Sequence, residues 1–130
     1  MKRIIVILSL IITGLLSTGC PSGAVEMGLL QGHVTIGPLS PVENPDERPP
    51  VPCEVYEARK IVVYDKNGRN LLQQVDIDCD SRYRVELEPG IFTIDINHIG
   101  IDSSADVPKQ VEIMAGVTFR LDIDIDTGIR

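Results

Sequence analysis

Residues 82–96 read RYRVELEPGIFTIDI, and this stretch decides the fold class. Apolar side chains occupy every second position on either side of its Pro-Gly pair: Tyr83, Val85 and Leu87, then Phe92, Ile94 and Ile96. A period of two is that of a strand with one buried face and one solvated face. Pro89 fixes φ and Gly90 permits a left-handed step, so the pair suits a tight turn. The stretch predicts two strands joined at residues 88–90.

The same alternation extends through most of the chain. It recurs in residues 30–36, 110–113 and 119–126, whereas Ile61 to Tyr64 is continuously apolar, as in a more buried strand. Asn67-Gly68 favours a type I′ hairpin turn between a strand near 59–66 and one near 69–77. Seven strands at short spacing, with no helix in the mature chain, predict an all-β protein with a β-sandwich fold.

The N-terminus is typical of an export signal. Lys2 and Arg3 precede a mostly apolar run from Ile4 to Leu16, and small residues follow it. The run is too short for a membrane-spanning helix, which needs roughly 18 residues. Residues 16–20, Leu-Ser-Thr-Gly-Cys, resemble a bacterial lipobox, although Ser17 stands where that motif usually has Leu. The resemblance implies cleavage of a signal-peptide helix before Cys20 and acylation of its thiol. The alternative is an ordinary signal peptide with an incidental cysteine.

Three segments follow from this interpretation. Residues 1–19 are the signal peptide, 20–27 a lipidated tether, and 28–130 one domain of ordinary size. Removing residues 1–19 takes away two cations and no acid, so the net charge changes from −7 to −9. Such a protein is repelled by phosphate backbones, so we expect no nucleic-acid partner.

A proline-rich stretch interrupts the strand pattern. Residues 37–52 contain six prolines, which remove backbone donors and fix φ. They predict a long, semi-rigid loop between the first two strands. Loops longer than about 15 residues are uncommon in compact domains and often carry function, although a passive loop is the simpler alternative.

Three short motifs resemble the carboxypeptidase regulatory-like domain. They are Gly32-His33-Val34, Asp78 to Tyr83 and Leu87 to Ile94, with Ser81 where that family usually has Gly. The strand pair within residues 111–126, with a turn at Ala115-Gly116, fits the same pattern. The resemblance implies a transthyretin-like Greek-key sandwich and a non-catalytic accessory role. It transfers no catalytic residue.

Two cysteines remain after acylation of Cys20. Export places Cys53 and Cys79 in an oxidising setting in most lineages. If Asn67-Gly68 is a two-residue turn, Tyr56 faces Cys79, and Cys53 lies at the same end of the sheet. The pair is therefore a candidate disulfide. Two separate thiols are the alternative.

Metal and catalytic motifs are sparse. Asp76, Asp78 and Asp80 are calcium candidates, but an EF-hand loop starting at Asp76 would need Gly at position 81 and Glu at position 87, where Ser and Leu stand. No zinc-binding or nucleophile motif is present, so we expect no cofactor and no enzymatic activity. The carboxylates of residues 122, 124 and 126 share one face of a predicted strand and are expected to face solvent.

These observations predict a lipid-anchored module on the extracytoplasmic side of the cell envelope. The expected membrane is the outer one if the source has two. Its partners would be the membrane, through Cys20, and an envelope protein, since the chain combines a long loop with no catalytic motif. A calcium- or carbohydrate-binding surface module is the alternative function.

Overall fold

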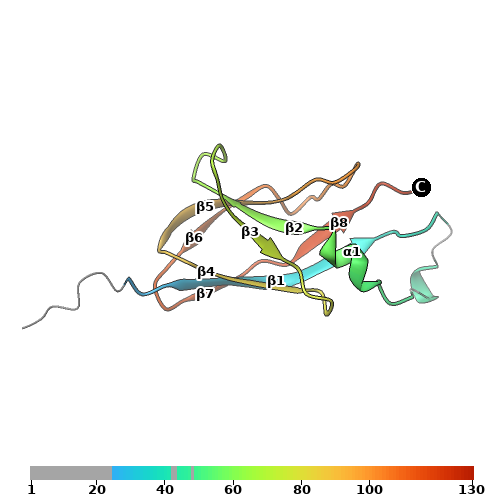
Figure 1. Ribbon diagram of the computed structural model, residues 1–130, viewed down its shortest axis with the longest axis horizontal. Coiled ribbons are helices and arrows are strands. Elements are labelled where there is room, and N and C mark those ends of the chain that lie inside the picture. The colour runs from blue at the N-terminus through green and yellow to red at the C-terminus, as the bar shows by residue number, and fades with distance from the viewer. Residues whose placement is uncertain (1–24, 42–43, 48) are drawn as a thin grey trace, which may run out of the picture.

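Two β-sheets pack against each other in the computed structural model, which describes residues 25–41, 44–47 and 49–130. The signal peptide and Cys20 therefore lie outside the described residues. One sheet contains β1 (Gly28–Gly37), β4 (Arg82–Leu87), β7 (Thr118–Arg120) and β8 (Ile123–Asp126). The other contains β2 (Lys60–Tyr64), β3 (Leu71–Asp76), β5 (Gly90–Ile96) and β6 (Lys109–Ile113). Figure 1 shows the two layers along the long axis of the molecule.

Strand β1 organises the first sheet. It pairs antiparallel with β4 on one side and parallel with both β7 and β8 on the other. The second sheet has the order β3-β2-β5-β6, and each of its pairs is antiparallel. The β-sandwich prediction is thus confirmed, while the Greek-key, transthyretin-like connectivity stays a prediction.

The core lies between the sheets and is built almost entirely from aliphatic side chains. Branched residues fill it because the chain has no Trp and few other aromatics. Each strand of the predicted alternating type contributes every second residue, as in the buried Tyr83, Val85 and Leu87 of β4. The fully buried members include Leu30, Val34, Ile61, Val63, Ile94, Ile123 and Ile125.

The edge of the first sheet is broken where β7 ends and β8 begins. The Leu121 carbonyl lies over Gly32, where a Cβ atom would be only 1.9 Å from the oxygen. That carbonyl accepts a hydrogen bond from the Tyr83 hydroxyl at 2.5 Å. The backbone N–H of His33 donates to Asp122 Oδ1 at 2.9 Å. The Leu121 N–H still donates to the Gln31 carbonyl at 2.9 Å, so side-chain groups supplement the backbone ladder at this point.

The sheet topology corrects two sequence-based predictions. The structure describes eight strands instead of seven, because the predicted strand 119–126 is divided into β7 and β8. The predicted pairing within residues 111–126 is also wrong: β6 belongs to the second sheet, whereas β7 and β8 belong to the first. The turn at Ala115-Gly116 carries the chain from one sheet to the other.

The β2–β3 hairpin has a different turn from the predicted type I′. A type I′ turn needs positive φ at both central residues, and of the predicted pair only Gly68 has it, with a φ of 70°. The Gly68 N–H donates to the Asp65 carbonyl, and the Asp65 carboxylate accepts from the backbone of Arg69 and Asn70. A bulge between Val63 and Tyr64 then shifts the predicted register by one residue.

Two short helices lie between β1 and β2, where the sequence predicted no helix. They are the 3₁₀ turn η1 (Pro45–Glu47) and the one-turn helix α1 (Cys53–Glu57). Tyr56 of α1 is buried against the core, which explains why this segment folds back onto the sandwich. Within the described ranges, no helix has the length and apolar character needed to span a bilayer.

We predict that Tyr83→Phe lowers the free energy of unfolding by about 1–2 kcal/mol. The substitution keeps the buried ring but leaves the Leu121 carbonyl without its hydroxyl donor. Tyr64→Phe is the matched control, because the Tyr64 hydroxyl makes no hydrogen bond among the described residues. Urea denaturation of both variants checks this, and equal midpoints for the two would contradict it.

Candidate functional site

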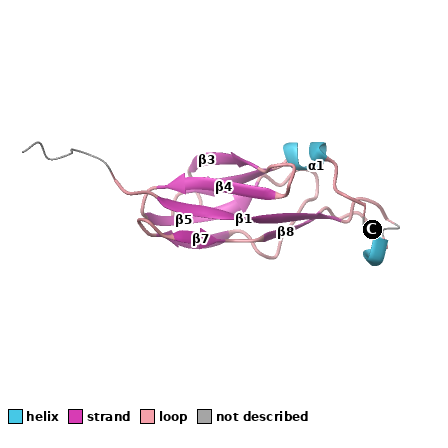
Figure 2. Cartoon of the chain, turned by 90° about the horizontal axis from the view of Figure 1, so that it is seen from below, coloured by secondary structure: helices cyan, strands magenta, loops and turns pink. Residues whose placement is uncertain are grey.

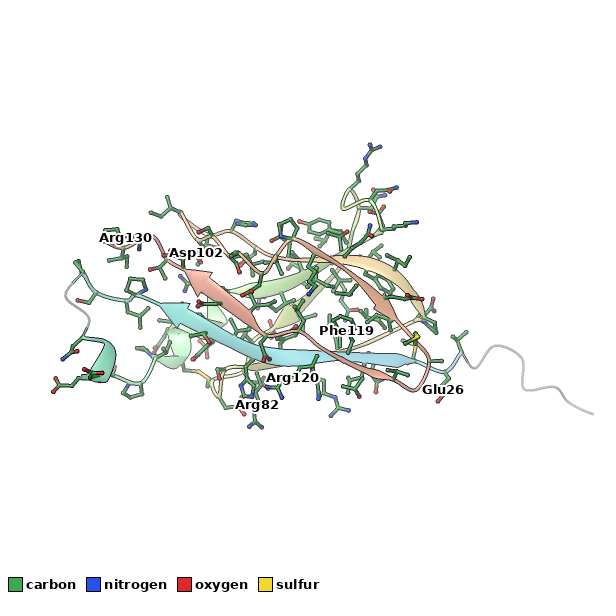
Figure 3. All side chains as sticks on the ribbon, turned by 180° about the vertical axis from the view of Figure 1, so that it is seen from behind. Glu26, Arg82, Asp102, Phe119, Arg120 and Arg130 are labelled. Atoms are coloured by element: carbon green, nitrogen blue, oxygen red, sulfur yellow. A yellow bond between two sulfur atoms is a disulfide. The ribbon has the colours of Figure 1, made fainter. Side chains whose placement is uncertain are left out.

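The sandwich has two structurally different ends. The end formed by residues 25–28, the 88–90 turn and the 114–117 turn is called the near pole. The opposite end is called the far pole, and its described residues are 37–41, 44–47, 49–59, 97–108 and 127–130. Figures 1 and 2 show the start of the described chain at one end and α1 with the C-terminus at the other. In Figure 3, Glu26 marks the near pole, while Asp102 and Arg130 mark the far pole.

The proline-rich loop is fixed at both of its ends on the far pole. At its start, the Thr127 N–H donates to the Gly37 carbonyl at 3.2 Å, and the Thr127 hydroxyl donates to the Pro38 carbonyl. Leu39 and Val51 pack against the core from opposite ends of the loop. Its described middle residues are exposed: Asn44, Asp46, Glu47, Pro49 and Pro50.

A buried ion pair connects α1 to the 97–103 segment. Arg59 donates through Nε and a terminal nitrogen to the Asp102 carboxylate at 2.8 and 3.2 Å, and a second terminal nitrogen donates to the Val55 carbonyl at 2.9 Å. The Arg59 and Asp102 side chains are mostly buried. A bidentate, doubly bonded guanidinium fixes the orientation of both partners. The helix after the loop is therefore held rigidly on the sandwich.

His98 extends this network toward solvent. Its Nδ1 lies 3.2 Å from the Asp102 carbonyl, and its Nε2 lies 2.9 Å from Asp95 Oδ1. The Asp102 carbonyl is the main cause of a raised pKa for His98, and the negative charge of Asp95 adds to it. Both contacts stabilise the protonated ring.

Cys53, the first residue of α1, lies next to Cys79 in the turn before β4. They form a disulfide with Cα atoms 4.8 Å apart, which joins α1 to the turn before β4. Glu57 Oε1 lies 3.3 Å from the Cys53 sulfur. A disulfide sulfur carries no proton, so this contact is a hydrogen bond only in the dithiol form. Cys53, Glu57 and Cys79 are also the one group of three potential metal ligands that converges within the described ranges.

The calcium candidates do not converge. Asp76 pairs with Lys60 across the β2–β3 ladder, and the Asp80 carboxylate lies 3.9 Å from Arg82. Asp76, Asp78 and Asp80 are all exposed. A solvated acidic turn accounts for them. The other acidic series lies as predicted, with Asp122 and Asp124 facing solvent between the buried residues of the final strands.

Two surface hollows were not predicted from the sequence. The larger, about 520 Å³, lies on the far pole between the start of the loop, at Pro38 and Pro41, and the acidic end of β8, at Asp124 and Asp126. The second, about 470 Å³, lies on the outer face of the first sheet. Its charged lining is mixed in sign: Asp78, Asp80, Arg82, Arg84 and Arg120. Arg82 and Arg120 come from different strands and lie on the same side of the molecule in Figure 3.

Ser81 and His33 form a Ser–His contact on the first sheet that does not have the geometry of a catalytic pair. Ser81 Oγ lies 3.5 Å from His33 Nδ1, a long distance for a nucleophile and its base. Asp122 accepts from the backbone N–H of His33. A carboxylate that bonds the backbone does not orient the imidazole ring, so these residues lack the relay that activates a serine.

Comparisons with known proteins give a fold and no family. No family model and no curated protein matches the chain. A similar solved structure is the minor pilin GBS52 of the Gram-positive pathogen Streptococcus agalactiae, with 14% identity and a TM-score of 0.52. The alignment covers 78% of this chain and 45% of the pilin. A DUF3823 family protein from Parabacteroides merdae has 12% identity and a TM-score of 0.47, with 78% and 46% covered. This chain thus spans less than half of either protein.

We predict that His98 titrates above its ordinary pKa of 6.5 in the folded protein. Because the folded-state pKa exceeds the unfolded one, protonation of His98 stabilises the fold below about pH 6.5, and this contribution disappears as the pH rises through the folded-state pKa. Histidine NMR titration measures the pKa directly. Asp95→Asn should lower it, because the variant removes the neighbouring charge. A His98 pKa at or below that of an unfolded peptide would contradict the prediction.

We predict that Cys53 and Cys79 are oxidised in the exported protein. In a Cys20→Ala variant, denatured protein should react with no thiol reagent before reduction and with two equivalents afterwards. Double replacement by Ser should destabilise the fold by about 3.5 kcal/mol, the chain-entropy estimate for a sequence separation of 26. Equal thiol counts with and without reductant would instead favour separate thiols.

Proposed function

We propose that this protein is a lipid-anchored, non-catalytic interaction module of the cell envelope. The observation that carries the proposal is the position of the proline-rich loop at the pole opposite the end that leads back to Cys20. The anchor follows from the lipobox resemblance, and the interaction surface is the far pole. This function places the module on the extracytoplasmic side, on the outer membrane if the source has two.

The dimensions of β1 support this arrangement. The strand has ten residues, and at about 3.3 Å per residue it extends roughly 33 Å from the near pole to the far pole. A chain held at Cys20 through a short tether would therefore present the loop well away from the lipid surface. A loop whose two ends are fixed and whose described middle residues are exposed suits recognition, because its ends lose no further conformational freedom on binding.

The charge of the far pole indicates the kind of partner. Asp46, Glu47, Glu54 and Glu57 are exposed along the loop and α1. Asp124 lines the adjoining hollow, where Arg130 neutralises Asp126. An acidic surface attracts a partner with a basic surface and repels anionic polymers. We therefore propose a protein partner with a cationic docking face. We also propose that the sandwich is a transthyretin-like, carboxypeptidase regulatory-like domain, which the sequence motifs at residues 32–34, 78–83 and 87–94 support.

We predict that deleting residues 41–50 abolishes partner capture while the domain stays folded. The deletion leaves Leu39, Val51 and Val55, whose side chains pack against the core. Cross-linking of intact cells followed by mass spectrometry should identify a neighbour with the native chain and lose it with the deletion.

Two controls separate the anchor from the loop. Cys20→Ala removes the proposed acylation site and should also lose the neighbour. Lys66→Ser with Arg69→Ser changes the exposed β2–β3 turn at a distance from the loop and should keep it. A neighbour that persists after the deletion would overturn the role of the loop.

A further inference from the structure

We propose that the near pole is a membrane-contact surface that holds the sandwich upright on the bilayer. The contact consists of four exposed apolar side chains, Val25, Met27, Met114 and Val117, which we call the apolar cap. The proposal deepens the proposed function and rests on acylation of Cys20. Its occupant is the lipid headgroup region of the membrane that holds the acyl chains.

The apolar cap is one structural unit. The Gly116 N–H donates to the Met27 carbonyl at 3.0 Å, the Leu29 N–H donates to the Val117 carbonyl at 3.0 Å, and Val117 closes a turn with Met114. The start of β1 and the 114–117 turn are thus fixed to each other by backbone hydrogen bonds. Any surface that meets one of these segments meets both.

The four cap side chains are apolar, yet they are exposed to solvent. The exposed fractions are 56% for Val25, 39% for Met27, 52% for Met114 and 44% for Val117. Single exposed apolar residues are ordinary, but a cluster on adjoining segments marks a surface that another apolar phase covers. Ile91, at the start of β5 beside the same pole, is exposed as well.

The length of the tether identifies the covering surface. Cys20 and Val25 are five residues apart, and extended chain spans at most about 3.6 Å per residue, so the cap lies within roughly 18 Å of the acylated residue. An acyl anchor holds Cys20 at the membrane interface. The anchor therefore keeps the lipid surface at a high effective concentration around the near pole, which favours lipid over a diffusing protein as the occupant.

Charge limits how deep the contact goes. Glu26 lies between the cap residues, where its carboxylate approaches Gly116, and Glu88 is exposed in the turn after β4. Burying these carboxylates in hydrocarbon is unfavourable, so the cap rests among the headgroups while the acids stay hydrated. The contact should be stronger on zwitterionic lipid than on anionic lipid.

Single tryptophans test this orientation, because the chain contains none. The lipidated protein is reconstituted into phosphatidylcholine vesicles with a nitroxide quencher on the lipid headgroup, which quenches tryptophan at headgroup depth. Met114→Trp reports on the near pole. Leu72→Trp, at 55% exposure on β3, reports on the flank, and Ile101→Trp, at 72% exposure, reports on the far pole. The three share the same probe and differ only in position.

We expect Met114→Trp to lose about half of its fluorescence and to shift to shorter wavelength, with little change at Leu72→Trp and Ile101→Trp. Quenching at Leu72→Trp instead would show a sandwich lying on its side and would overturn the proposal. No quenching at any position, with the protein still bound to vesicles, would also overturn it and would leave the anchor intact. An unmodified mass at Cys20 would overturn the anchor itself, and this orientation with it.

Discussion

The approach of the Leu121 carbonyl to Gly32 is the constraint on which the first sheet depends. Strand β1 extends from pole to pole, and the final segment of the chain must lie along it on both sides of the break. Leu29 faces Thr118 and Val34 faces Ile123, so the same register continues through the interruption. A side chain at position 32 would push the last segment away and separate β8 from β1. The Tyr83 hydroxyl completes the junction from β4.

The sequence predicted what side-chain burial determines and missed what backbone bonding determines. Alternation identified β1, β4, β5 and β6 because each buries every second residue. The same alternation continues through Leu121 and Ile123, which are both buried, so no side-chain pattern marks the break between β7 and β8. The hairpin shows the same limit. Gly68 was identified, but the turn geometry depends on the Asp65 carboxylate.

The candidate site was predictable only in part, for a related reason. The proximity of Cys53 and Cys79 was predicted from the register of the β2–β3 hairpin. That prediction holds even though the observed register is shifted by one residue. The Arg59–Asp102 pair was missed because 43 residues separate the two charges and no local pattern relates them. A weak signal was present: Asp102 follows the apolar Ile99 and Ile101, an unusual setting for a carboxylate that lacks a cation.

The two poles are built by different physical means, and the difference accounts for their proposed roles. On the far pole, a disulfide, a buried bidentate ion pair and the Thr127 hydrogen bonds fix the segments on either side of the loop. These bonds restrict the loop ends. The loop ends therefore lose their conformational entropy when the protein folds, and not when it binds a partner. The near pole has no equivalent among the described residues. Its segments are joined by backbone hydrogen bonds and expose aliphatic side chains, which makes them suited to a fluid lipid surface that imposes no geometry.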